Sequence, residues 1–163
     1  MDAHTVVTLL ACLRTAGVDV WIGGGWGVDA LLGRQTRPHR DLDLMHDLEY
    51  EHLLVSVLKE NGYAETFDAR PVRFVMTHTS GLELDLHPLV FAADGSARQA
   101  ADDLGATFDY PRECFVTGRV LRTMVPCLSA AQQVYFHRGY EPRDHDLHDM
   151  ARLREAFGVS THF

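Results

Sequence analysis

The sequence has few cysteines and no long hydrophobic run. Three of its 163 residues are cysteine (Cys12, Cys114 and Cys127), and no two of them form a C-x-x-C pair. This pattern argues against a disulfide framework and against a zinc knuckle. No stretch approaches the roughly 20 apolar residues that a membrane-spanning helix needs. Residues 1–4 also lack the positive charge of a secretory signal, so we expect a cytoplasmic protein without a membrane partner.

Positive charge is scarce as well. Lysine and arginine together number 15 against 23 aspartates and glutamates, a formal net charge of −8, and Lys59 is the only lysine. A nucleic-acid surface needs clustered cations that displace counterions from the phosphates, so this balance predicts no nucleic-acid partner. An acidic protein suits instead a small cationic ligand, which an acidic pocket attracts.

The apolar residues, 46% of the chain, are sufficient for a folded core. Alternation of apolar and polar residues predicts strands, and apolar residues at helical spacing predict helices. The expected strands are 18–22, 41–45, 72–78, 82–90 and 115–125, the last with a turn at Gly118. The expected helices are 5–16, 26–32, 50–60, 130–138 and 143–157. Residues 91–113 show no clear pattern. This order predicts an α+β fold, with a mixed sheet domain over 1–125 and a helical C-terminal region over 126–163 that packs on it.

Two carboxylates share one face of the expected strand 41–45. Side chains at positions i and i+2 of a strand lie about 6.6 Å apart on the same face, so Asp41 and Asp43 can converge on one cation while Leu42 and Leu44 face the core. Hard oxygen ligands of this kind suit Mg²⁺, which usually brings substrate phosphates with it. The alternative is a solvated strand face that carries two acids.

The expected strand 82–90 repeats the pattern. Glu83, Asp85 and His87 share one face, and leucines alternate with them on the other. If this strand lies beside the first, Asp85 joins the same cation site, as in two-metal phosphoryl chemistry, or accepts a proton from an attacking hydroxyl. The alternative is again the wet face of a half-exposed sheet.

Three glycines, Gly23 to Gly25, lie between an expected strand and an expected helix. Backbone N–H groups at such a helix start favour a phosphate, and glycine permits close approach. No Gly-Lys-[Ser/Thr] follows, so this is not a P-loop. A tight turn without a ligand is the alternative.

Together these features form a more specific pattern than any of them alone. The sequence reads GGWGVDALL over 24–32, TRPHRD over 36–41, YFHRGY over 135–140 and DHDLHD over 144–149, with Asp85 on a further acidic strand. This combination resembles the polymerase-β-like nucleotidyltransferase superfamily, and within it the lincosamide and aminoglycoside 2″-nucleotidyltransferases.

The resemblance implies a Mg²⁺-dependent enzyme that moves a nucleoside monophosphate from a nucleoside triphosphate, with ATP the first choice, to a hydroxyl of a small cationic acceptor. A lincosamide or aminoglycoside antibiotic is the expected acceptor. The resemblance implies that Asp41, Asp43 and Asp85 hold the metal. It makes Asp85 the general base, with His87 as the second candidate.

The resemblance also implies that the backbone N–H groups of Gly24 and Gly25 bind phosphate, with added charge from Arg40 or Arg37. Asp29 is expected to be a structural helix residue. The lincosamide relatives further suggest a homodimer.

Two other classes of protein stay open at this point. The nucleotidyltransferase fold can serve as a non-catalytic binding module or as one half of a toxin–antitoxin pair, which the loss of a metal-site acid would signal. The pairs His145–Asp146 and His148–Asp149 also invite an HD-type phosphohydrolase, although both pairs lie on one late helix.

Overall fold

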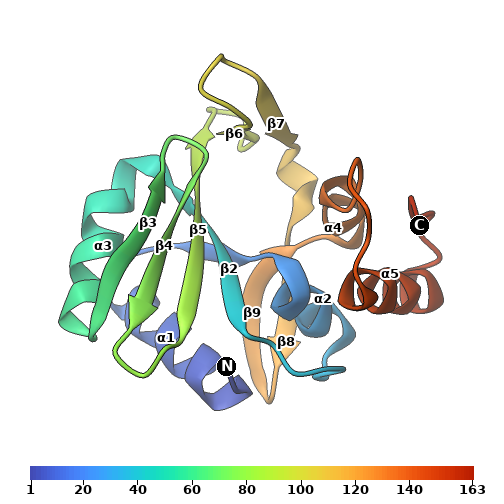
Figure 1. Ribbon diagram of the computed structural model, residues 1–163, viewed down its shortest axis with the longest axis horizontal. Helices are drawn as coiled ribbons and strands as arrows, with labels where there is room; N and C mark the ends of the chain where they lie inside the picture. Colours follow the sequence, from blue (N-terminus) through green and yellow to red (C-terminus); the bar gives the residue numbers. More distant parts are fainter.

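A twisted mixed sheet runs through the centre of the molecule, with helices on both sides, in a computed structural model that describes residues 1–163 (Figure 1). The helices are α1 (Ala3–Thr15), α2 (Gly24–Leu32), α3 (Glu51–Glu60), α4 (Ala130–Phe136) and α5 (Asp144–Phe157), with short 3-10 turns η1 (Leu48–Tyr50) and η2 (Arg112–Cys114). The strands are β1 (Val20–Ile22), β2 (Asp41–Asp47), β3 (Tyr63–Ala69), β4 (Arg73–His78), β5 (Glu83–Phe91), β6 (Ala97–Ala100), β7 (Thr107–Tyr110), β8 (Phe115–Val120) and β9 (Thr123–Leu128). None of the helices is long and apolar enough to cross a membrane.

The two acidic strands are neighbours at the centre of the sheet. The strand order is β3-β4-β5-β2-β1-β9-β8, and β6 and β7 branch from the end of β5. β2 and β5 run parallel, with Asp43 opposite Asp85 and Asp41 opposite Glu83. The expectation that these strands lie side by side is therefore confirmed. In a parallel pair, side chains at matched positions point to the same face, so the register places the carboxylates together.

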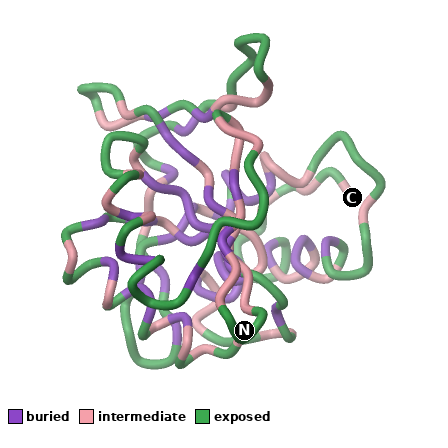
Figure 2. The backbone as a smooth tube through the Cα atoms, turned by 60° about the vertical axis from the view of Figure 1, so that its left-hand side comes forward, coloured by how far each residue is buried: buried purple, intermediate pink, exposed green.

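The opposite face of the same two strands is the main core. Leu42, Leu44, Leu84 and Leu86 are fully buried there, in one cluster with apolar side chains of α1 and α3. Each such leucine contributes about 1.5–3 kcal/mol relative to an exposed position. Figure 2 shows that the buried segments concentrate at the centre of the molecule, with exposed loops at its rim. This leucine face fixes which way the acids point.

The C-terminal helices pack on α2 and not on α1 or α3. The side chains of Val28, Ala130, Val134, Met150 and Leu153 form a separate buried cluster between α2, α4 and α5. β9 continues to Leu128, beyond the boundary expected at residue 125, so the helical region begins at Ser129, whose side chain caps α4. The α+β fold class is confirmed, and α5 lies beside the start of the helix that carries the glycines.

The turn expected at Gly118 was wrong. Gly118 lies inside β8, and a Cβ there would stand 2.6 Å from the backbone of Ala30, because α2 packs directly on this strand. The turn lies after Val120 instead, where Leu121 has a φ of 55°. Glycine at position 118 therefore serves helix–sheet packing. Helix α2 also begins two residues earlier than expected, at Gly24 rather than at Trp26.

A partly buried ionic network ties β2 to the turn between β3 and β4. His46 and Arg70 both donate hydrogen bonds to the Glu51 carboxylate, at 3.1 Å and 2.7 Å. The Arg70 guanidinium also pairs with Glu65 and lies 3.6 Å from the centre of the Phe74 ring. Burial alone raises the pKa of Glu51, but the bonds from His46 and Arg70 outweigh it and hold the pKa below its usual 4.5.

The variant Glu51→Gln is expected to lose about 1–3 kcal/mol of stability at neutral pH, because His46 and Arg70 lose a charged acceptor. A carboxyl whose pKa is lowered on folding stabilises the fold above its unfolded pKa and loses that contribution as the pH falls through the folded value. The deficit measured by urea unfolding should therefore shrink below pH 4.5. The exposed Glu49→Gln is the control, with an expected change under about 0.5 kcal/mol. A deficit that is equal at neutral and acid pH would contradict the ionic account.

Candidate active site

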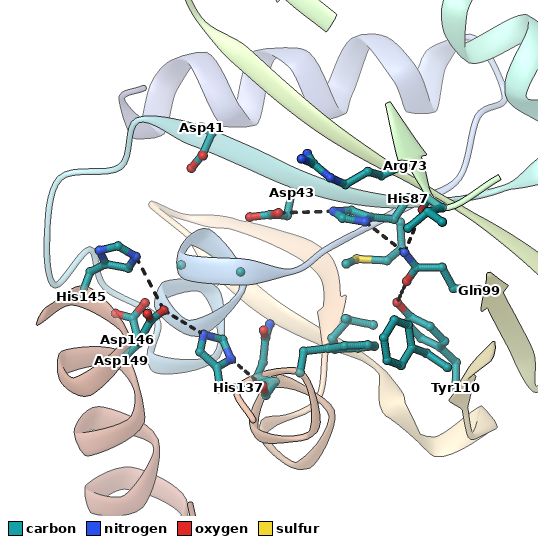
Figure 3. A pocket seen from close by; sticks show the side chains of 18 of the residues that line it. Asp41, Asp43, Arg73, His87, Gln99, Tyr110, His137, His145, Asp146 and Asp149 are labelled. Atoms are coloured by element: carbon teal, nitrogen blue, oxygen red, sulfur yellow. Dashed lines mark hydrogen bonds and ion pairs between the residues drawn. The ribbon is translucent and has the colours of Figure 1, made fainter. Parts of the chain in front are cut away.

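A cavity of about 400 Å³ opens on the carboxylate face of the sheet (Figure 3). Asp41, Asp43 and Met45 of β2 line it, together with His87 of β5 and the start of α2. The helices α4 and α5 supply the wall opposite the sheet. The cavity therefore lies where the two acidic strands, the glycine segment and the C-terminal region meet.

Three side chains that can bind a metal converge beside this cavity. The ligand atoms of Asp43, Asp85 and His87 all lie within 4.8 Å of one another. His87 Nε2 is 3.3 Å from Asp43 Oδ1 and 3.7 Å from Asp85 Oδ1. Asp41 lines the same cavity, but it lies at the N-terminal end of β2 and is not part of this close group.

Asp85 is the most unusual carboxylate of the group. Arg73 Nη1 donates to its Oδ2 at 2.6 Å, whereas its Oδ1 is buried and has no hydrogen-bond partner. Burial raises the pKa of Asp85, and the neighbouring charge of Asp43 adds to that shift. Asp85 lines a second, neighbouring cavity. Asp41 and Arg73 line both cavities. Two close carboxylates with an unpartnered oxygen fit a hard divalent cation such as Mg²⁺.

The glycines at the start of α2 are required by close packing. Gly24 has a φ of 53°, and a Cβ on it would lie 2.0 Å from Asp43 Oδ2. A Cβ on Gly25 would lie 2.3 Å from an Arg37 guanidinium nitrogen. The N-cap residue Gly23 provides no side-chain cap. The first backbone N–H groups of α2 thus face the cavity edge beside Asp43, where an anion would find donors and the positive end of the helix dipole.

The two arginines of the loop before β2 point in different directions. Arg37 lines the cavity and donates two hydrogen bonds to Asp149 of α5, at 2.9 Å and 2.6 Å. The Arg40 side chain is 84% exposed and pairs with Glu83 at 3.3 Å, outside this cavity. The structure thus brings Arg37, and not Arg40, to the start of α2. Arg40, one residue before β2, lines instead the second cavity, to which Asp85 also contributes.

Asp29 has the structural role that was expected for it. Its carboxylate accepts hydrogen bonds from the backbone and the hydroxyl of Thr36, and it pairs with His39 Nε2 at 2.5 Å. The His39 ring packs against Trp26, with the ring centres 4.6 Å apart. These contacts tie the loop to α2 and hold Arg37 at the cavity.

The histidines of the C-terminal region form part of the cavity wall. His137 and His145 both contact Asp146 (Figure 3). Their Nε2 atoms lie 3.7 Å and 3.6 Å from Asp146 Oδ1. The group of side chains spaced to bind a metal forms on β2 and β5, and not at the His–Asp pairs of α5. The His–Asp pairs of α5 therefore do not form the metal centre that an HD-type phosphohydrolase requires.

Three residues that line the cavity were not predicted from the sequence: Arg73, Gln99 and Tyr110. They lie on β4, β6 and β7 and reach the acids only through the fold. Gln99 Nε2 is 3.2 Å from His87 Nδ1, and the Tyr110 hydroxyl donates to Gln99 Oε1 at 2.5 Å. Neither belongs to a local motif, and both come from the stretch 91–113 that showed no clear pattern.

Known proteins resemble this chain over most of its length. Residues 5–153 match the family model described as aminoglycoside-2″-adenylyltransferase. A lincosamide resistance protein of Staphylococcus haemolyticus is 33% identical over 137 residues, which is 84% of each chain.

Solved structures agree with these matches. The crystal structure of the lincosamide antibiotic adenylyltransferase LnuA with bound lincomycin superposes with a TM-score of 0.86 at 30% identity, covering 94% of this chain and 97% of that one. ANT(2″)-Ia in complex with adenylyl-2″-tobramycin has a TM-score of 0.75 at 22% identity, with 96% and 89% covered, and supports the fold. The resemblance to the nucleotidyltransferase superfamily is thereby confirmed, and the chain belongs to the aminoglycoside-2″-adenylyltransferase family of antibiotic nucleotidyltransferases.

Proposed function

We propose that this enzyme transfers a nucleoside monophosphate from a Mg²⁺-bound nucleoside triphosphate, with ATP the first choice, to a hydroxyl of a lincosamide or aminoglycoside. The observation that carries the proposal is the convergence of Asp43 and Asp85 beside the open start of α2. Acids that hold a cation and amides that hold a phosphate are the two parts that phosphoryl chemistry needs at one place.

Asp41, Asp43 and Asp85 are the residues that would hold Mg²⁺. When bound, the ion neutralises charge on the phosphates and orients them for in-line displacement. Gly24 and Gly25 would donate backbone N–H groups to the phosphates. Arg37, beside Gly25, is a more suitable source of positive charge at these glycines than Arg40, which lines the second cavity and pairs with Glu83.

Asp85 is proposed as the general base. The acceptor oxygen forms a bond to the α-phosphorus, the bond from that phosphorus to pyrophosphate breaks, and the hydroxyl proton passes to the carboxylate. A carboxyl whose pKa is raised by burial is better matched to this task than an ordinary one. Arg73, bonded to Oδ2, fixes the orientation of the carboxylate.

The acceptor is proposed to bind between the sheet and the C-terminal helices. Asp146 presents negative charge there, and Phe108 and Phe136 give the same cavity an apolar wall. The negative charge suits the cationic amine of an aminoglycoside or lincosamide. The aromatic wall suits the faces of its sugar rings. The homodimer suggested by the resemblance stays a prediction, which the molecular mass in solution checks.

The test is pyrophosphate release from ATP with a panel of lincosamides and aminoglycosides, with and without Mg²⁺. We expect release that requires both the metal and one class of acceptor. Nucleotide binding without release on any acceptor would favour the non-catalytic module. Failure to bind nucleotide at all would contradict the proposed function.

A further inference from the structure

Gln99 is a buried glutamine whose side-chain amide is held at both ends. The residue is 5% exposed. Its Nε2 lies 3.0 Å from the carbonyl oxygen of Val72 and 3.2 Å from His87 Nδ1. Its Oε1 accepts a hydrogen bond from the hydroxyl of Tyr110, which is 1% exposed. Figure 3 shows the chain of contacts that runs from Tyr110 through Gln99 to His87 and Asp43.

The partners of Gln99 determine the orientation of its amide. A backbone carbonyl only accepts hydrogen bonds, so the atom beside Val72 must be the NH₂ group. Burial raises the pKa of Tyr110, which keeps the phenol protonated and able to donate to Oε1. Turning the amide over would set its oxygen against the Val72 carbonyl oxygen. Gln99 therefore donates to His87 Nδ1, and His87 must accept at that atom.

This contact determines where His87 carries its proton. A neutral imidazole that accepts at Nδ1 bears its hydrogen on Nε2. Nε2 lies 3.3 Å from Asp43 Oδ1, within hydrogen-bond distance, and 3.7 Å from Asp85 Oδ1, which has no hydrogen-bond partner. A histidine that binds a metal usually donates its other ring N–H to an acceptor. Here the other nitrogen meets a donor instead.

We propose that Gln99 and Tyr110 are positioning residues that hold His87 as the Nε2–H tautomer, so that His87 donates to the carboxylate of Asp43 and turns the same N–H side of its ring toward Asp85. His87 is then neither the general base nor a metal ligand. It keeps the Asp43 carboxylate in place beside Asp85, with Asp43 Oδ2 and the unpartnered Oδ1 of Asp85 left for a cation. The assignment deepens the proposed function, although the tautomer itself is a property of the protein alone.

The test is the ring ¹⁵N NMR spectrum of the purified full-length protein without metal or nucleotide, with the His87 signals assigned from their loss in His87→Gln. We expect a pyrrole-type Nε2 and a pyridine-type Nδ1 in the wild type. In Gln99→Glu, a carboxylate replaces the donor, so Nδ1 should gain a proton. Arg98→Gln is the control, because it makes the same change in net charge on the same strand at an exposed position, and its His87 signals should not move.

A wild-type His87 that is protonated on Nδ1 would overturn the assignment, whether or not Gln99→Glu folds. An unchanged His87 spectrum in a folded Gln99→Glu would overturn the role of Gln99. In the transfer assay, Gln99→Glu should lower kcat by about 10–100-fold, because it displaces His87, the hydrogen-bond partner of a carboxylate proposed to hold the metal, and Arg98→Gln should leave kcat unchanged. If the wild type transfers nothing to any acceptor, the proposed function fails, and the spectrum still decides the tautomer.

Discussion

The variant Asp43→Asn is expected to fold normally and to lose at least about a thousandfold in turnover, which corresponds to about 4 kcal/mol of barrier. Asp43 accepts a hydrogen bond from His87 and lies against the first turn of α2. It therefore joins the proposed metal site to the backbone N–H groups that are proposed to bind phosphate. Asparagine has the same shape and lacks the charge that holds a divalent cation. The side chain of Asp43 is 29% exposed, so the substitution does not bury an unpaired polar group.

Stability should be unchanged or slightly higher in this variant, because the repulsion between Asp43 and Asp85 disappears. The measurement is kcat together with urea unfolding. The control is Asp103→Asn, which removes one negative charge from an exposed loop and should leave both quantities unchanged. Near-normal transfer by a folded Asp43→Asn would show that the metal site is wrongly assigned.

The variant Gly24→Ala is expected to lose activity because its methyl group clashes with Asp43, without any change of charge. A Cβ at this position would lie 2.0 Å from Asp43 Oδ2, which is closer than atoms can approach, so the carboxylate must move. A displacement of about 1 Å in a catalytic group costs on the order of 100-fold in rate. The positive φ adds about 1–2 kcal/mol of backbone strain.

Gly17→Ala separates these two effects. Gly17 also has a positive φ, 78°, but nothing lies within 4 Å of the Cβ that alanine would add. It should lose comparable stability in urea unfolding and keep its kcat, whereas Gly24→Ala loses both. Equal activity of the two variants would contradict a functional need for the close approach of Gly24 to the Asp43 carboxylate.

The centre of the fold could be predicted because its strands alternate strictly. The leucines that alternate with the acids at 41–43 and 83–87 must face the core, so the acids must face the other side of the sheet. The parallel register then brings Asp43 and Asp85 together. β3 could not be predicted in the same way, because it is an edge strand with most of its residues exposed. Without a buried face there is no alternation to detect.

The candidate site could be predicted only where its residues belong to local motifs. The acids and glycines follow one another along the chain, and sequence spacing places them. Arg37 and Arg40 cannot be told apart by spacing, since which one reaches the cavity depends on the bond from Arg37 to Asp149, far along the chain on α5. Gln99 likewise reaches His87 only because β6 pairs with the end of β5.

The most direct test of the proposed chemistry is the intact mass of the acceptor antibiotic after incubation with the enzyme, ATP and Mg²⁺. The account predicts that one hydroxyl hydrogen is replaced by a single adenylyl group, with one pyrophosphate released for each product. An acceptor that gains only a phosphoryl group would contradict attack at the α-phosphorus. An acceptor of unchanged mass, after every lincosamide and aminoglycoside has been tried, would contradict nucleotidyl transfer to these antibiotics.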